Sequence, residues 1–301
     1  MFAVTFARYG DPSVLEVSEQ PDPQAGPGQV RIAVQAAAVN GYDWKLRAGY
    51  LQEVAPVDFP AVPGLEAAGV VDQVGEGVHG VAVGDKVFGL GRRTWAQYAV
   101  LDHFAAKPAG LGWPEASGIA VVAETAQRCL DLLGAGAGQT LLVDGAAGGV
   151  GSAVAQFARA AGVTVLGTAS EANHAYLTSL GVLPTTYGPG LAERVARLAP
   201  QGVDLALDTA GRGSVPELVA ITGSPDRVLT IADFTAGQYG VRTTSRSSAF
   251  GALAKAADLV AADAFALRVD SVYPLASAAA AHQRSQQGHP AGKVVLSLTE
   301  E

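Results

Sequence analysis

The stretch from Thr140 to Gly151, T-L-L-V-D-G-A-A-G-G-V-G, joins an apolar run to a glycine-rich turn, and an amphipathic run from Ser152 to Ala161 follows it. A strand that ends in such a turn and opens into a helix lets the backbone approach a pyrophosphate, whose charge the helix N-terminus favours. The sequence therefore predicts a dinucleotide-binding turn, with a glycine-rich connector as the alternative. Against the template G-x-G-x-x-G, Ala146 replaces the first glycine, while Gly148 and Gly151 keep the positions for close approach and helix packing. The residues predicted to hold the cofactor here are Ala146, Ala147, Gly148, Gly149, Val150 and Gly151.

The pattern of strands and turns around this stretch divides the chain into two parts. From Met1 to about Gly112, short strands alternate with turn residues, which predicts a small antiparallel barrel. A helix is predicted from Ala116 to Leu133, and strands then alternate with helices, which predicts an α/β fold with a doubly wound parallel sheet. A length of 301 residues is long for one core and suits two domains.

Composition narrows the class of partner. The net charge is −8, and no cluster of basic residues exceeds the pair Arg92-Arg93, so the chain lacks the basic surface that binds nucleic acid. The single cysteine, Cys129, excludes an internal disulfide and agrees with a reducing compartment. No uncharged apolar run reaches transmembrane length, and the N-terminus does not resemble a signal peptide. The sequence therefore predicts a cytoplasmic protein that binds a small molecule and neither nucleic acid nor membrane.

Five segments carry a resemblance to one family. The turn G-A-A-G-G-V-G after T-L-L-V resembles the cofactor turn of the quinone oxidoreductase (zeta-crystallin-like) branch of the medium-chain dehydrogenase/reductase superfamily. The other matches follow the family's order: A-V-N-G-Y-D-W-K from Ala38, P-G-L-E-A-A-G-V-V from Pro63, V-G-D-K-V-F-G from Val83, and H-P-A-G-K-V-V-L from His289. The resemblance implies a GroES-like partial β-barrel catalytic domain over residues 1–112 and 263–301, and a Rossmann nucleotide-binding domain over residues 113–262.

The resemblance also implies that the enzyme works without zinc. Zinc-dependent relatives carry a Cys at the position of Asn40 and a His-Glu pair at the positions of Leu65 and Glu66. Asn40 and Leu65 cannot supply thiolate and imidazole ligands, which leaves Glu66 as a structural carboxylate. Without a metal as Lewis acid, the natural reaction delivers a hydride to a carbon that is already electrophilic, as in a quinone or the β-carbon of an enone.

Two residues could stabilise the charge that develops on the acceptor oxygen. Tyr42 lies where zinc-dependent relatives carry the Ser or Thr hydroxyl that relays a proton, and Asn40 could add a second donor. The alternative is that Tyr42 forms only an aromatic wall of the substrate pocket. Arg92 and Arg93 replace a longer segment of many relatives and are predicted to contact a polar substrate.

The cofactor is predicted to be NADPH, with NADH as the alternative. About 20 residues beyond the turn, where an acid would hold a 2′-hydroxyl, the chain has Thr168 and no acid at the strand tip. Ser170, His174 and Tyr187 resemble the family's phosphate contacts, although relatives often carry Lys at the position of His174. Glu171 departs from the pattern, because an inward-pointing acid would repel a phosphate.

The nicotinamide end of the cofactor is predicted to lie near Thr125, which matches a family threonine, and near strand ends at Ala210, Ile231 and Ala232. Lys293 either reaches the cofactor or is an ordinary lysine at a strand start. Glu124 stands where the family usually has an apolar residue, and the sequence does not explain it.

Two other functions stay open from the sequence: an enoyl reductase acting on a larger biosynthetic substrate, and a non-catalytic NADPH-binding sensor or structural protein. The segment from Gln238 to Arg246, with a predicted edge strand at Val241 to Thr244, is β-rich. Because an uncovered edge strand invites pairing across a two-fold axis, we expect a homodimer.

Overall fold

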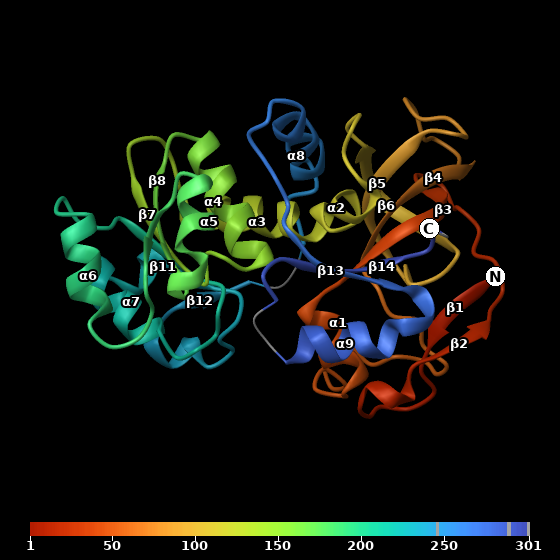
Figure 1. The fold of residues 1–301 in the computed structure, drawn as a ribbon, viewed down its shortest axis with the longest axis horizontal. Coiled ribbons are helices and arrows are strands. Elements are labelled where there is room, and N and C mark those ends of the chain that lie inside the picture. The colour runs from red at the N-terminus through yellow and green to blue at the C-terminus, as the bar shows by residue number, and fades with distance from the viewer. Residues whose placement is uncertain (245–246, 288–289, 300–301) are drawn as a thin grey trace. The chain divides into compact units, whose positions relative to one another are not determined.

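The computed structural model of the chain describes residues 1–244, 247–287 and 290–299 (Figure 1). It divides into two compact units, unit 1 (Met1–Val121 with Gly251–Glu301) and unit 2 (Val122–Phe250). This division groups residues 113–121 and 251–262 with unit 1, whereas the sequence prediction gave them to the Rossmann domain. The exact limits of the two domains stay a prediction. His289, at the start of one family motif, and the last two residues of the 238–246 segment lie outside the described residues.

Unit 1 is built on a sheet with the strand order β13-β14-β3-β4-β5-β6 (Figure 1). Strand β3 pairs with both β4 and β6, so these strands curl into the partial barrel that the sequence predicted. The pairs among β3, β4, β5 and β6 are antiparallel, as predicted for the N-terminal part of the chain, whereas the C-terminal strands β13 and β14, for which no direction was predicted, run parallel. Strands β1 and β2 form a separate antiparallel pair. The strands are β1 Phe2–Thr5, β2 Glu16–Glu19, β3 Val30–Val39, β4 Glu66–Val74, β5 Lys86–Arg92, β6 Tyr98–Ala106, β13 Val269–Pro274 and β14 Lys293–Ser297.

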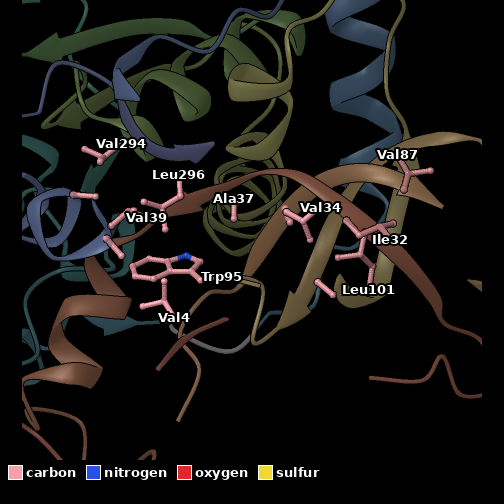
Figure 2. Packing of buried hydrophobic residues seen from close by; sticks show 14 of the residues in the cluster. Val4, Ile32, Val34, Ala37, Val39, Val87, Trp95, Leu101, Val294 and Leu296 are labelled. Atoms are coloured by element: carbon pink, nitrogen blue, oxygen red, sulfur yellow. The ribbon is translucent and has the colours of Figure 1, made fainter. Parts of the chain in front are cut away.

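The core of unit 1 follows from the alternation along β3, where every second side chain from Val30 is buried until the strand becomes buried on both faces. Figure 2 shows Val4, Val39 and Leu296 gathered around the indole of Trp95. The indole nitrogen of Trp95 donates a hydrogen bond of 3.1 Å to the carbonyl of Ala38, which satisfies the one polar atom of this fully buried side chain. The core therefore holds β3 firmly, and Asn40 comes directly after its last residue.

The helices of unit 1 include one that the sequence pattern did not reveal, α1 (Gly41–Arg47), which is only two turns long and starts at a glycine. The helix predicted from Ala116 to Leu133 is interrupted at Gly118, which separates α2 from α3. A Cβ on Gly118 would lie 2.8 Å from Leu267 Cδ2 and 2.9 Å from Lys293 Cε, so a larger residue here would require one of these side chains to shift. The helices and 3-10 helices of this unit are η1 Pro12–Val14, α1, α2 Trp113–Ser117, α8 Ala252–Ala261, η5 Leu275–Ser277 and α9 Ala278–Gln286. Helix α3 (Ile119–Leu133) begins in unit 1 and continues into unit 2.

Unit 2 is a parallel sheet with the strand order β12-β11-β10-β7-β8-β9 (Figure 1). Every pairing between these neighbours is parallel, and the order reverses direction between β7 and β10, which is the doubly wound Rossmann arrangement that the sequence predicted. The predicted edge strand appears as β12, which is shorter than expected. Strand β9, with a proline at its centre, was not predicted. The strands are β7 Thr140–Asp144, β8 Thr164–Thr168, β9 Leu183–Thr185, β10 Leu205–Asp208, β11 Val228–Thr230 and β12 Arg242–Thr243.

Apolar side chains of the central strands, such as Leu142, Leu166 and Ala206, pack with Leu191 of α6 and Leu218 of α7 to form the core of unit 2. Loops follow the carboxyl ends of these strands, and doubly wound sheets bind their ligands at these ends. No helix in the described parts of the chain is both long and apolar enough to cross a bilayer. The helices and 3-10 helices are α4 Gly149–Ala160, η2 Glu171–Asn173, α5 His174–Ser179, α6 Leu191–Leu198, α7 Val215–Thr222, η3 Pro225–Arg227 and η4 Ala236–Tyr239.

Candidate functional site

The glycine-rich turn between β7 and α4 begins with a residue in the left-handed region, Gly145 at φ +82°. Its amide donates a hydrogen bond of 3.0 Å to the hydroxyl of Thr168, and its carbonyl accepts one of 3.1 Å from the Gly148 amide. The tight-turn conformation thus falls on Gly145, one residue before the template position that Ala146 occupies. Ala146 is fully buried, and its amide is bonded at 3.0 Å to the carbonyl of Thr168.

Two glycines of this turn have different steric surroundings. A Cβ on Gly151 would lie 2.3 Å from the carbonyl oxygen of Gly145, so only glycine lets α4 begin against the turn. A Cβ on Gly148 would meet only that same oxygen, at 3.4 Å, so this residue presents an open face. Gly148 precedes the first turn of α4, and no side chain of the described residues caps that turn. The backbone N–H groups of Gly149, Val150 and Gly151 therefore form a helix N-terminus that fits a pyrophosphate.

Buried carboxylates fix the loops at the carboxyl ends of β7 and β10. Asp144 accepts hydrogen bonds from the hydroxyls of Thr168 and Ser214, the latter at 2.6 Å. Asp208 accepts bonds of 2.8 Å from the backbone amides of Ala210 and Gly211 through one oxygen. Sequence reasoning did not single out these two acids, although each ends an apolar strand, as T-L-L-V-D and L-A-L-D.

The loop after β11 is tied to the same carboxylate. The hydroxyl of Thr230 donates a bond of 2.7 Å to the second oxygen of Asp208 and accepts one of 3.1 Å from the amide of Ala232. The amide of Ile231 donates 3.1 Å to the backbone carbonyl of Asp208. The predicted cofactor residues Ala210, Ile231 and Ala232 therefore share one hydrogen-bonded framework.

The predicted 2′-phosphate residues lie in the loops after β8 and β9. Ser170 precedes η2 and accepts a hydrogen bond of 3.1 Å from the side-chain amide of Asn173. His174 begins α5, and its buried Nε2 atom has no hydrogen-bond partner among the residues that the structure describes. Tyr187 is 44% exposed, and the guanidinium carbon of Arg212 lies 5.0 Å from the centre of its ring. Sequence reasoning missed Arg212.

Helix α3 supplies Thr125 together with a buried ion pair. Glu124 Oε1 accepts hydrogen bonds from Arg128 Nε at 2.9 Å and from the backbone amides of Ser248 and Ala249 at 2.8 and 3.2 Å. Burial opposes ionisation of Glu124, but the bonds from Arg128 and Ser248 outweigh it and hold the pKa of this carboxyl below its ordinary value. These contacts explain why an acid can stand at this position.

Arg128 extends the same network to Thr125. Its guanidinium donates 2.7 Å to the hydroxyl of Thr244 and 3.4 Å to the hydroxyl of Thr125. Arg128 therefore orients the threonine that the sequence predicted near the nicotinamide. Sequence reasoning missed Arg128, although its spacing of four residues from Glu124 on one helix was a visible signal for an ion pair.

In unit 1 the ammonium group of Lys293 joins two predicted site residues. Lys293 Nζ donates hydrogen bonds of 2.7 Å to Glu66 Oε1 and 2.7 Å to Asn40 Oδ1. Asn40 Nδ2 donates 3.0 Å to the same oxygen of Glu66, and Glu66 Oε2 accepts 2.8 Å from the amide of Val121. Lys293 is 5% exposed and Glu66 is 0% exposed, so this is a buried and internally paired set.

Helix α1 begins directly after Asn40 and carries Tyr42 as its second residue. Its third residue, Asp43, is 1% exposed and accepts a hydrogen bond of 2.7 Å from the amide of Asn40. Burial raises the pKa of Asp43 to about 7, although the Asn40 amide and the charge of Lys293 both act to lower it. Through this hydrogen bond, Asp43 fixes the backbone of Asn40 at the start of α1.

Tyr42 itself is 38% exposed, and partial burial raises the pKa of its phenol, while the charge of Arg92 acts in the opposite direction. Tyr42 and Arg92 are therefore within electrostatic reach of one another. Arg93 is exposed and has φ +61°, an uncommon conformation for a residue with a side chain.

The residues at the family's zinc position do not fit that metal. Asn40 uses its carbonyl oxygen for Lys293 and one N–H for Glu66, and Leu65 is apolar. Across the described ranges, no group of three or more His, Cys, Asp or Glu side chains could hold a metal ion. A tetrahedral zinc needs several such ligands, so the donor set of this site disagrees with a catalytic zinc.

Two family models match the chain, one described as "Alcohol dehydrogenase GroES-like domain" over residues 26–153 and one as "Zinc-binding dehydrogenase" over residues 190–296. The chain belongs to the medium-chain dehydrogenase/reductase superfamily. Among curated proteins, it is 37% identical over 212 residues to erythronolide synthase EryA2 of Saccharopolyspora erythraea, a match that covers 66% of this chain and 6% of that protein. The chain thus spans a small part of that much longer relative.

Solved structures of this superfamily superpose along almost the whole chain. An NAD-dependent alcohol dehydrogenase shares 29% identity with a TM-score of 0.86, covering 99% of this chain and 100% of that one. The quinone oxidoreductase from Coxiella burnetii shares 26% identity with a TM-score of 0.84 and 99% coverage of both chains. A mycobacterial protein complexed with NADPH shares 28% identity with a TM-score of 0.84, covering 99% of this chain and 100% of that one.

Proposed function

We propose that this protein is an NADPH-dependent oxidoreductase that transfers a hydride to a quinone or an α,β-unsaturated carbonyl without zinc. The observation that carries the proposal is the hydrogen-bonded set of Lys293, Glu66 and Asn40. The positive charge of this set is the ammonium group of Lys293, which donates hydrogen bonds of 2.7 Å to Asn40 and to Glu66. The side chains of this set do not provide the ligands of a tetrahedral zinc site. Such a site favours acceptors that need no Lewis acid for activation.

The turn and strand ends of unit 2 are the residues that would hold the cofactor. The N–H groups of Gly149 to Gly151 fit the pyrophosphate, the loops after β8 and β9 fit the adenosine end, and Thr125 with the loops after β10 and β11 fits the nicotinamide end. When bound, the reduced nicotinamide supplies a hydride. The mycobacterial relative that binds NADPH supports this choice of cofactor.

The chemistry assigned to this chain's own residues is stabilisation of negative charge on the acceptor oxygen. Because its pKa is raised, the phenol of Tyr42 stays protonated at neutral pH and can donate a hydrogen bond. Asn40 has two N–H donors and uses one for Glu66, so the other can serve the same oxygen. Lys293 and Glu66 act as positioning residues, since they fix the orientation of the Asn40 amide.

A panel of acceptors tests the proposal. Protein treated with a chelator and then freed of it is assayed with NADPH against simple quinones and enones, and with NADP⁺ against simple alcohols. We expect oxidation of NADPH with quinones or enones and little reduction of NADP⁺ by alcohols. Efficient alcohol oxidation that is lost on chelation and restored by zinc would overturn the proposal, and binding of NADPH without consumption would favour the non-catalytic alternative.

A further inference from the structure

The corner between β5 and β6 carries two exposed residues, Arg92 and Arg93. The chain that follows them is fixed, because Thr94 is fully buried and its hydroxyl donates a hydrogen bond of 3.0 Å to the backbone carbonyl of Glu66. A Cβ on Gly64, which has φ +104°, would lie 2.3 Å from the same hydroxyl oxygen, so a larger residue there would displace Thr94. The two arginines therefore stand on a firm support at the start of β4.

The backbone of this corner has an unfavourable conformation at Arg93, whose φ of +61° lies in the left-handed region. Among the described residues other than glycine, Asp263 is the one further example of a positive φ. Such a conformation disfavours any side chain and persists where the surrounding structure imposes it. The chain thus holds a charged residue where a glycine would be less strained, directly beside Arg92.

Arg92 lies within electrostatic reach of Tyr42, since its charge acts to lower the pKa of that phenol. Within the described ranges, the guanidinium of Arg92 forms neither an ion pair nor a hydrogen bond. The charge of Asp43 acts on the same phenol in the opposite direction, but this carboxyl is 1% exposed and bonded to the amide of Asn40. Arg92 is therefore an exposed cation, without a carboxylate partner, beside the phenol proposed to face the acceptor.

We propose that the acceptor of this enzyme carries a carboxylate, and that Arg92 binds this carboxylate while Tyr42 faces the acceptor's carbonyl oxygen. This rests on the proposed function and narrows its acceptor to an enone or quinone with one negative charge. A guanidinium pairs with a carboxylate through two parallel N–H···O bonds, and its one permanent charge matches one negative charge. The carboxylate takes no part in the reduction, in which the enone gains a hydride from NADPH and a proton from water.

A matched pair of acceptors tests the proposal. One is a short enone whose terminal carboxylate is separated from the double bond by two methylene groups, and the other is its primary amide. The methylene groups insulate the double bond, so the two compounds differ chiefly in charge. We measure kcat/KM for both with saturating NADPH on wild-type protein, R92Q and R92K. Because the charge of Arg92 also acts on Tyr42, the readout is the ratio of the acid to the amide.

We expect wild-type protein to prefer the acid. Loss of a charge-assisted hydrogen bond predicts that R92Q lowers the acid-to-amide ratio roughly 10- to 100-fold. R92K keeps the charge without the planar fork, so it should lower the ratio less than R92Q does. R8Q removes another exposed arginine of unit 1 and should leave both the ratio and the individual rates unchanged.

The outcomes separate this proposal from the function beneath it. An equal ratio in R92Q and the wild type would overturn the proposal and leave the proposed function standing, because Arg92 would then act through Tyr42 alone. Wild-type protein that reduces the amide more efficiently than the acid would overturn it in the same way. Wild-type protein that oxidises NADPH with neither compound, nor with any simple quinone, would overturn the proposed function itself.

Discussion

Replacing Lys293 by Met removes the positive charge of the buried set while keeping a side chain of similar length. Glu66 is 0% exposed, so its carboxylate would be left buried with the two other hydrogen bonds that the described residues give it, from Asn40 Nδ2 at 3.0 Å and the Val121 amide at 2.8 Å. Removing one partner of a buried ion pair costs about 3–5 kcal/mol. Because two donors remain on Glu66, we expect K293M to lose about 3 kcal/mol of unfolding free energy.

The assay is urea unfolding at neutral pH, followed by circular dichroism, for K293M, E66Q and the double variant. Replacing both charges removes the uncompensated carboxylate, so the double variant should recover much of the loss of K293M. K86M, which removes an exposed lysine, should change the stability by less than about 1 kcal/mol. A loss below about 1 kcal/mol in K293M, or additive losses in the double variant, would refute the pairing deduced from the structure.

Three further predictions concern other parts of the chain. Tyr42→Phe should lower turnover with saturating NADPH and enone by ~100- to 1,000-fold, or ~2.7–4 kcal/mol, if the phenol donates to a developing oxyanion; unchanged turnover would leave it as a pocket wall. Burial, reinforced by the charge of Arg47, lowers the pKa of His282 to about 3. The stabilisation from keeping His282 neutral is complete above pH 6.5 and is lost as the pH falls toward 3, so unfolding free energy should drop by about 2 kcal/mol between pH 7 and pH 5. His282→Gln should flatten that slope, and a slope equal to that of the wild type would contradict the assignment. The protein should sediment as a homodimer at micromolar concentration, whereas a monomeric mass would contradict the expected pairing at β12.

The architecture could be predicted from the sequence because it depends on local patterns. The alternation along β3 and the strand-turn-helix around Gly148 are visible within a few residues, and they led to the partial barrel and the parallel sheet. The direction of β13 relative to β14 was not visible in this way. A parallel pair requires a crossover, and α9 provides it between these strands, but a periodic pattern does not fix strand direction.

The site was harder to predict because its contacts join residues that are far apart in the chain. The sequence left Lys293 between a cofactor contact and an ordinary lysine, and its partner Glu66 lies 227 positions away. Arg212 and Arg128 were missed for the same reason, since each contributes through a loop or helix whose neighbours only the fold reveals. The roles of Tyr42, Asn40 and the predicted cofactor residues remain predictions until they are measured.

The most direct test of the central claim is the fate of the hydride. Metal-free protein is incubated with an enone and NADPH that carries deuterium at the transferable position, and the product is examined by mass spectrometry and nuclear magnetic resonance. We expect one deuterium on the β-carbon of the saturated carbonyl product, with no zinc added. A product without deuterium, or transfer that occurs only after zinc is supplied, would contradict zinc-independent hydride delivery by this protein.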